Sequence, residues 1–176
     1  YSHNVYTYNL QHDPVEDAIS LNMHVECEDC HNPHAVRKLV AEAPNVNGFL
    51  EGVKGVNRSG IPVFPAQYEY EICFRCHADS PLKPAGNTAR QIEQSNVRLE
   101  FDVNNPSYHP VESTGKNQNV PSLISPLTEA SQIYCSDCHA SDGSDSPAGP
   151  HGSVYPAILK YAYNNNTTNK TNIIPL

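Results

Sequence analysis

Three short stretches decide how this chain is organised: Cys27-Glu-Asp-Cys30-His31, Cys73-Phe-Arg-Cys76-His77 and Cys135-Ser-Asp-Cys138-His139. They contain all six cysteines of the 176 residues and leave none over. Only nine histidines occur in the chain, yet one follows the second cysteine every time. The repeated unit is therefore Cys-x-x-Cys-His and not the cysteine pair alone.

This unit is the attachment sequence of a c-type haem. Two thiols separated by two residues lie on one side of a single turn, where each adds to one vinyl group of the same macrocycle. The histidine that follows then points at the iron as its proximal ligand. The sequence predicts three covalently bound haem c groups, with thioether bonds from Cys27, Cys30, Cys73, Cys76, Cys135 and Cys138 and iron bonds from His31, His77 and His139.

Three other interpretations of the cysteines explain less. A disulfide framework does not require histidine at these positions. A thioredoxin-like redox site has one Cys-x-x-Cys within a βαβ pattern, whereas this chain has three and no such pattern. Paired Cys-x-x-Cys units can bind zinc, but zinc binding leaves the three histidines unexplained.

The composition indicates that the chain lacks an ordinary hydrophobic core. Leu, Ile, Val and Phe supply 37 of 176 residues, Trp is missing, and 15 prolines and nine glycines interrupt regular structure. A domain of this size normally buries more apolar mass. Covalently fixed, mostly apolar haems would supply what the side chains do not.

Charge and hydropathy exclude two classes of partner. The formal net charge is −8, and the 11 lysines and arginines are scattered, so no nucleic-acid partner is expected. No stretch approaches the roughly 18 apolar residues of a membrane span. The sequence starts at Tyr1 without a visible signal peptide, which we interpret as a processed, exported product. The predicted location is extracellular, with the periplasm or cell surface as alternatives.

We expect one domain over residues 1–176: an N-terminal arm (1–23), a haem-binding core (24–153) and a C-terminal tail (154–176). The predicted fold is mostly irregular coil with a few short α-helices and little or no β-structure, a compact chain wrapped around a row of three haems. Helices are predicted over residues 35–43, 90–101, 127–139 and 155–163. In the third, Ser125 and Pro126 suit the N-cap and first helical position.

Each haem iron also needs a sixth ligand or keeps an open position. The remaining histidines are His3, His12, His24, His34, His109 and His151, and Met23 is the one methionine. This supply exceeds the demand of three and favours two imidazoles on every iron. Imidazole stabilises ferric iron and lowers its reduction potential. The sequence thus predicts low-potential haems.

His34 is the strongest candidate for such a distal ligand. It lies three residues after His31, too close to reach the opposite face of the same haem, so it should serve another haem nearby. His109 and His151 come next, since each adjoins Pro or Gly. His24 has the same reach problem as His34 and either serves another haem or hydrogen-bonds a propionate.

His3 and His12 lie on the N-terminal arm. Either they are terminal histidines without a role, or one of them reaches a neighbouring subunit and completes a haem there. Separately, Asn-x-Ser/Thr sequences predict glycosylation at Asn57, Asn165, Asn166 and Asn169.

The stretch His24-Val-Glu-Cys27-Glu-Asp-Cys30-His31-Asn32-Pro33-His34, followed by Ile72-Cys73-Phe74-Arg75-Cys76-His77, resembles the doubled CxxCH module of multihaem c-type cytochromes. Tyr108-His109-Pro110-Val111-Glu112, the third attachment sequence and Gly149-Pro150-His151-Gly152-Ser153 add to the resemblance, which covers about residues 24–153. It implies electron transfer outside the cytoplasm. Some of these cytochromes polymerise end to end into extracellular filaments (nanowires) with haems in a continuous line, although many of their subunits carry more than three.

The predicted function is long-range electron transfer through closely stacked, low-potential haems, as the repeating subunit of a conductive filament and not as an enzyme. The expected partners are further copies of the chain, with a histidine shared between subunits, and other redox cytochromes or extracellular electron acceptors. One alternative is a monomeric electron shuttle. The other is a multihaem reductase in which one haem keeps an open position.

Overall fold

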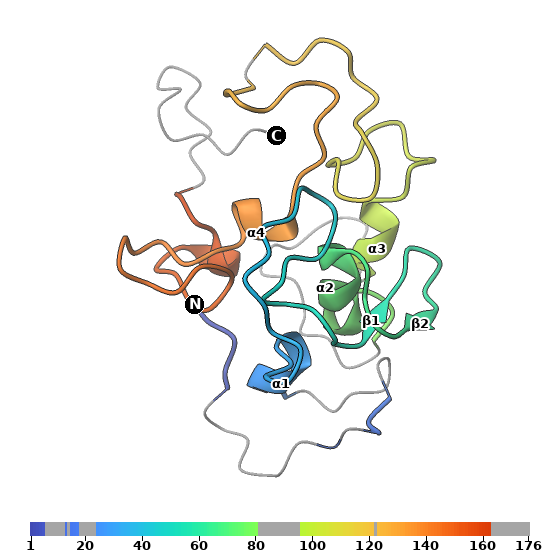
Figure 1. Ribbon diagram of the computed structural model, residues 1–176. Helices are drawn as coiled ribbons and strands as arrows, with labels where there is room; N and C mark the ends of the chain where they lie inside the picture. The colour runs from blue at the N-terminus through green and yellow to red at the C-terminus, as the bar shows by residue number, and fades with distance from the viewer. Residues whose placement is uncertain (6–12, 14, 18–23, 81–95, 122, 163–176) are drawn as a thin grey trace.

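The computed structural model describes residues 1–5, 13, 15–17, 24–80, 96–121 and 123–162. Its helices are α1 (Cys27–Cys30), α2 (Glu69–His77), α3 (Val97–Glu100) and α4 (Cys135–Cys138), with a 3-10 turn at Pro156–Ile158. Two strands, β1 (Gly55–Val56) and β2 (Pro62–Val63), form an antiparallel pair. Long irregular segments connect these elements (Figure 1). The prediction of a mostly irregular fold with a few short helices and little β-structure is confirmed.

The longest helix among the described residues, α2, is not one of the helices predicted from the sequence. The carboxylate of Glu71 accepts the backbone N–H groups of Gln67 and Tyr68 and so fixes the start of the helix. Tyr70, Ile72 and Phe74 are buried along it. The attachment sequence places two cysteines among positions 73–76. The helical spacing of apolar residues is therefore interrupted there and could not be recognised in the sequence.

The core consists of two small clusters of buried apolar side chains that both include α2. One contains Val56, Tyr70, Phe74 and Ala78. The other contains Val53, Ala66 and Ile72. Gly55 of β1 lies where an added Cβ would come within 2.9 Å of the Cβ atoms of Ala66 and Glu71, so only glycine allows β1 to approach α2 this closely.

Residues 35–43 do not form the helix predicted there. The carbonyl of Asn32 accepts the N–H groups of Ala35 and Val36, which makes a turn. Beyond it the chain pairs with Gly48: Arg37 N–H donates to the Gly48 carbonyl, and Gly48 N–H donates to that of Leu39. Gly48 permits this contact because an added Cβ would collide with the Arg37 carbonyl. Close backbone approach outweighs the helical propensity of this alanine-rich stretch.

The helix predicted over 127–139 is also wrong, except for its last turn, α4. The hydroxyl of Ser131 accepts the N–H of Thr128, and the Thr128 carbonyl accepts the N–H of Ser131. Side chains of this type stabilise turns by competing with helical hydrogen bonds. Ile133 N–H then donates to the Pro110 carbonyl, which draws the chain away from a helical path.

The remaining helix predictions are only partly correct. Of residues 90–101, the helix covers Val97–Glu100, with the Asn96 side chain accepting Arg98 N–H at its start; residues 90–95 lie outside the described part. Of residues 155–163, only Pro156–Ile158 are helical, and residue 163 is not described. Ala157 and Ile158 have φ values of 57° and 54°, in the left-handed region, so an α-helix cannot continue through them.

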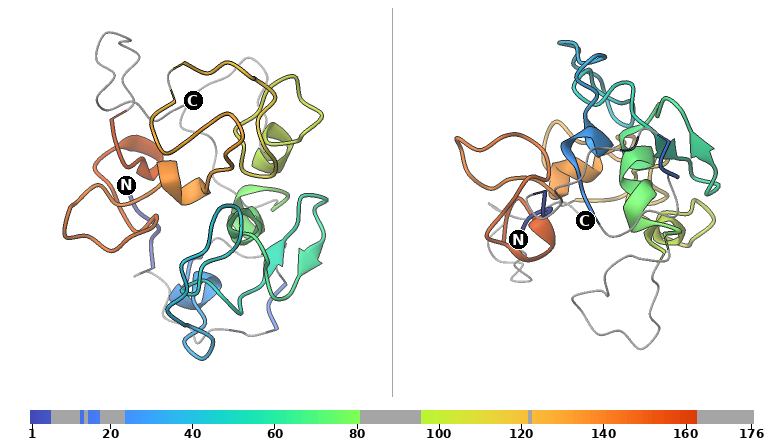
Figure 2. Two further views of the ribbon diagram at one scale, coloured as in Figure 1. Left: turned by 45° about the horizontal axis from the view of Figure 1, so that its top comes forward. Right: turned by 90° about the horizontal axis from the view of Figure 1, so that it is seen from below.

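The beginning of the chain lies against residues 150–153. The backbone nitrogen of Tyr1 donates to the Ser153 carbonyl over 2.7 Å, and Ser153 N–H donates back to the Tyr1 carbonyl over 2.8 Å. Figure 2 shows the N-terminus beside this segment in both views. Among the described residues, no helix has the length and apolar character needed to cross a membrane.

Candidate functional site

The first and third attachment sites share one local structure. In α1 the Asp29 carboxylate accepts the N–H of Glu26, and in α4 the Asp137 carboxylate accepts the N–H of Tyr134, each over 2.8 Å. The N–H of the following histidine then donates to the carbonyl of the first cysteine, over 2.8 Å at His31 and 2.9 Å at His139. The aspartate before the second cysteine therefore closes the turn, a role that sequence reasoning missed although Asp occupies both positions.

The rings of these two histidines are anchored in the same way. His31 Nδ1 lies 2.9 Å from the Phe49 carbonyl, and His139 Nδ1 lies 2.8 Å from the Ala157 carbonyl, each 18 residues further along the chain. With the proton on Nδ1, the lone pair of Nε2 is left for a metal. Histidines that bind metals usually donate their other ring N–H to a carbonyl or carboxylate in this manner.

Two of the three histidines of the Cys-x-x-Cys-His units lie close to a second imidazole. The rings of His31 and His151 are 6.0 Å apart and parallel to within 2°. The rings of His77 and His3 are 6.1 Å apart at 57°. An iron between two imidazoles, with metal–nitrogen bonds of about 2 Å and about 1 Å from each nitrogen to its ring centre, separates the rings by about 6 Å. Both ring separations match the distance expected for a six-coordinate haem iron.

His3 and His151 are held on one surface, where residues 1–3 meet 150–153. His3 Nδ1 lies 2.9 Å from the carbonyl of Pro150, the neighbour of His151. His3 therefore lies against its own chain. The approach of His3 to Pro150 depends on backbone pairing between segments some 150 residues apart, for which the sequence contains no signal.

The other candidate distal ligands lie elsewhere. His34 is exposed, and the His109 ring is 6.3 Å from that of Phe101. His24 is buried, with Nε2 3.4 Å from a carboxylate oxygen of Glu16. His12 lies outside the described residues. Within the described part of the chain, the structure pairs no second imidazole with His139.

Four of the six cysteines, Cys30, Cys73, Cys76 and Cys135, lie close to one another around α2. The Cys73 thiol is in hydrogen-bonding contact with the Cys135 thiol, and this contact together with burial raises the pKa of Cys73. Burial raises the pKa of Cys30 to about 12 and of Cys76 and Cys138 to about 11. No disulfide bond joins any of the six cysteines, all of which lie within the described residues. Among the described residues, no group of three or more His, Cys, Asp or Glu side chains is arranged to hold a bare metal ion.

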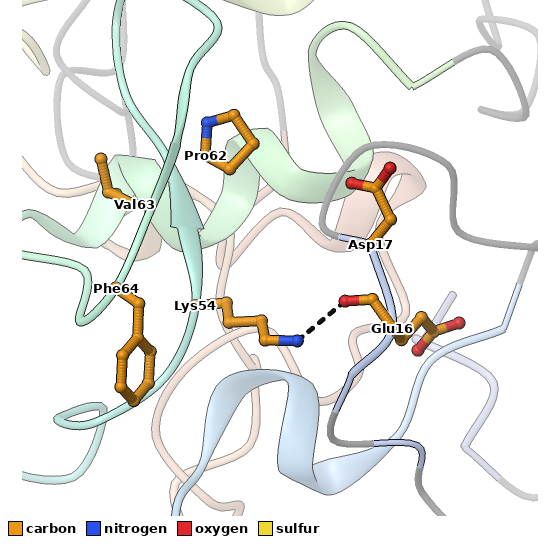
Figure 3. Close-up of a pocket in the computed structure, with 6 residues that line it drawn as sticks. All are labelled: Glu16, Asp17, Lys54, Pro62, Val63 and Phe64. Carbon is orange, nitrogen blue, oxygen red and sulfur yellow. Dashed lines mark hydrogen bonds between the residues drawn. The ribbon is translucent and has the colours of Figure 1, made fainter.

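Two cavities lie away from the attachment sites. One, of about 300 Å³, is open and is lined by residues of the 16–17 and 62–64 segments and by Lys54, whose Nζ donates to the Glu16 carbonyl over 2.8 Å (Figure 3). The other, of about 550 Å³, is polar and includes Tyr70 and Glu112 in its wall. Neither is bordered by a Cys-x-x-Cys-His residue.

One predicted glycosylation site, Asn57, lies in a turn in which its side-chain oxygen accepts the N–H groups of Ser59 and Ile61. Asn165, Asn166 and Asn169 are outside the described residues. Glycosylation thus stays a prediction at all four positions.

Comparison with known proteins gives no relative: no family model, no curated protein and no solved structure matches the chain.

Glu112 makes stability depend on pH. Burial first, and then the charge of Asp102, raises the pKa of its carboxyl from an ordinary 4.5 to about 7, against the opposing effect of Arg58 and Arg98. A raised pKa means that the folded state binds the proton more tightly. The free energy of unfolding should fall as pH rises from about 4.5 to about 7.

Urea unfolding across this pH range tests the effect. Glu112→Gln should flatten that part of the stability curve, whereas Glu42→Gln, at an exposed position, should leave it unchanged. Parallel curves for the parent protein and Glu112→Gln would contradict the assignment.

Proposed function

We propose that this protein is a triheme c-type cytochrome that carries electrons outside the cytoplasm. The observation that supports this most strongly is the arrangement of the attachment histidines. His31 and His139 are anchored through Nδ1, and His31 and His77 each face a second imidazole at about 6 Å. The attachment sequence alone does not require a second histidine at that distance.

In this proposal each residue of the attachment sequence has one task. The two thiols hold the haem edge by thioether bonds, and the histidine occupies the proximal position of the iron. Imidazoles from His151 and His3 would occupy the sixth coordination position of the first and second irons, respectively. Hydrogen bonds from Nδ1 of His31, His139 and His3 to backbone carbonyls orient the rings and increase the electron donation of Nε2.

A bound haem supplies a one-electron ferric–ferrous couple, which two imidazole ligands place at low potential. At the first two sites the chain would supply both axial ligands, so no coordination position would be left for a small molecule. Such sites suit electron transfer and not substrate turnover.

The third site supports two further possibilities. His139 faces no second imidazole within the described residues, which is the specific observation in favour of a reductase with one open haem. In a filament, an adjacent copy would close this position instead. Because His3 lies against its own chain, we assign the histidine that one copy donates to the third haem of the next copy to the exposed His34. The exposed side chains of Val36, Leu39 and Val40 follow it in the sequence. A monomeric shuttle remains the alternative to the filament.

Carbon monoxide binding to the reduced protein tests the two ligand pairs. His151→Ala and His3→Ala should each create one additional iron that binds carbon monoxide, because removal of a distal imidazole opens the sixth position. The matched controls, Val154→Ala and Ser2→Ala, change exposed neighbours and should bind no more than the parent protein. If neither histidine variant gains a carbon monoxide site, the pairs are wrong.

Electron microscopy of the haem-containing protein tests assembly. We expect uniform thin filaments, which His34→Ala should abolish and His109→Ala, at another exposed histidine, should retain. Dispersed small particles at every concentration would instead support the shuttle. A parent protein that binds carbon monoxide at one iron and forms no filament would support the reductase.

A further inference from the structure

Helix α2 lies between the other two attachment turns. Tyr70, Phe74 and Ala78 are four residues apart and line one face of the helix and its end, and Cys135 of α4 packs on the cluster that they form. Ile72 is on the opposite face, and Cys30 of α1 packs on its cluster. The first and third attachment sites therefore pack against two different clusters, both of which include residues of α2.

A buried ion pair joins α2 to α1. Arg75 Nη1 donates to the Asp29 carbonyl over 2.8 Å, and Nη2 lies 3.1 Å from a carboxylate oxygen of Asp29. Both side chains are almost completely buried, 4% and 5% exposed. Arg75 stands between Cys73 and Cys76, and Asp29 stands between Cys27 and Cys30. The pair thus connects the first and second attachment sequences directly.

A second buried contact joins α2 to α4. The Glu69 carboxylate accepts the Ser136 N–H and the Ser136 hydroxyl, each over 2.9 Å. Ser136 stands between Cys135 and Cys138. Cys135 itself packs against the apolar cluster that contains Tyr70 and Phe74 of α2.

We propose that the second haem is the middle of the redox chain, and that Arg75 and Glu69 are the positioning residues that hold the first and third haems against it. This inference rests on the proposed function. Each transfer oxidises one ferrous iron and reduces the next ferric iron, with no bond made or broken. Electrons then pass between the first and third haems by way of the second.

Arg75 should also adjust the reduction potentials. A buried cation beside Cys30 and Cys76 favours the less positive, reduced state of the haems attached there, and the low dielectric of the interior enlarges this effect. In Arg75→Met the cation is lost and the Asp29 carboxylate is left uncompensated. The potentials of the first and second haems should then fall, while that of the third should stay in place.

Spectroelectrochemistry tests this on four proteins: the parent, Arg75→Met, Arg75→Met/Asp29→Asn and Lys116→Met. We expect two of three midpoint potentials to fall in the first variant and to recover in part in the double variant, which removes both charges. Lys116→Met removes an exposed charge, which solvent screens, and should shift none. No shift in Arg75→Met, or an equal shift of all three haems, would overturn the assignment.

Proton NMR of the unmodified, reduced protein gives a test that does not depend on the folding of a variant. Nuclear Overhauser effects should join the thioether substituents of the second haem to those of the first and of the third. Effects that join the first and third haems, with none to the second, would contradict the proposed order. A purified protein without covalent haem would instead refute the proposed function itself, so the two failures are distinguishable.

Discussion

The structure depends on the way two of the attachment histidines, His31 and His139, are held. A one-turn helix gives the imidazole a position but leaves the ring free to rotate, so a carbonyl 18 residues further along fixes it, at Phe49 for His31 and at Ala157 for His139. Each of these hydrogen bonds closes a loop. The irregular segments between the helices are therefore anchored at both ends, which gives this chain, poor in apolar residues, defined contacts without extended sheets or long helices.

The side-chain core is small and centred on α2. Phe74, almost fully buried, lies between the two cysteines of the second attachment site, so the same helix carries a main core residue and a predicted haem. The charged groups that pack with it, Arg75 and Glu69, contact Asp29 and Ser136 of the neighbouring sites. Buried charges require such partners. In our account, the contacts of Arg75 and Glu69 also set the distances between the second haem and its two neighbours.

Sequence patterns predicted the irregular fold correctly, because low apolar content and frequent proline and glycine act locally. They failed where a distant segment intervenes. The stretch 35–43 favours a helix, but Gly48 pairs with its backbone, and residues 127–134 are held by Thr128, Ser131 and the carbonyl of Pro110. The ring of His151 lies 6.0 Å from that of His31, and the role of His151 as a distal ligand stays a prediction. The approach of His3 to His77 depends on the docking of Tyr1 at Ser153, for which the sequence contains no periodic signal.

The central claim is that six thiols hold three haems, and intact-mass spectrometry of the denatured native protein tests it most directly. Covalent attachment survives unfolding, so our account predicts that the protein, once any glycans are removed, has the mass of the polypeptide plus three haems. Proteolytic peptides should each carry one haem at Cys27/Cys30, Cys73/Cys76 and Cys135/Cys138. A mass equal to that of the unmodified chain, with six alkylatable thiols, would contradict it.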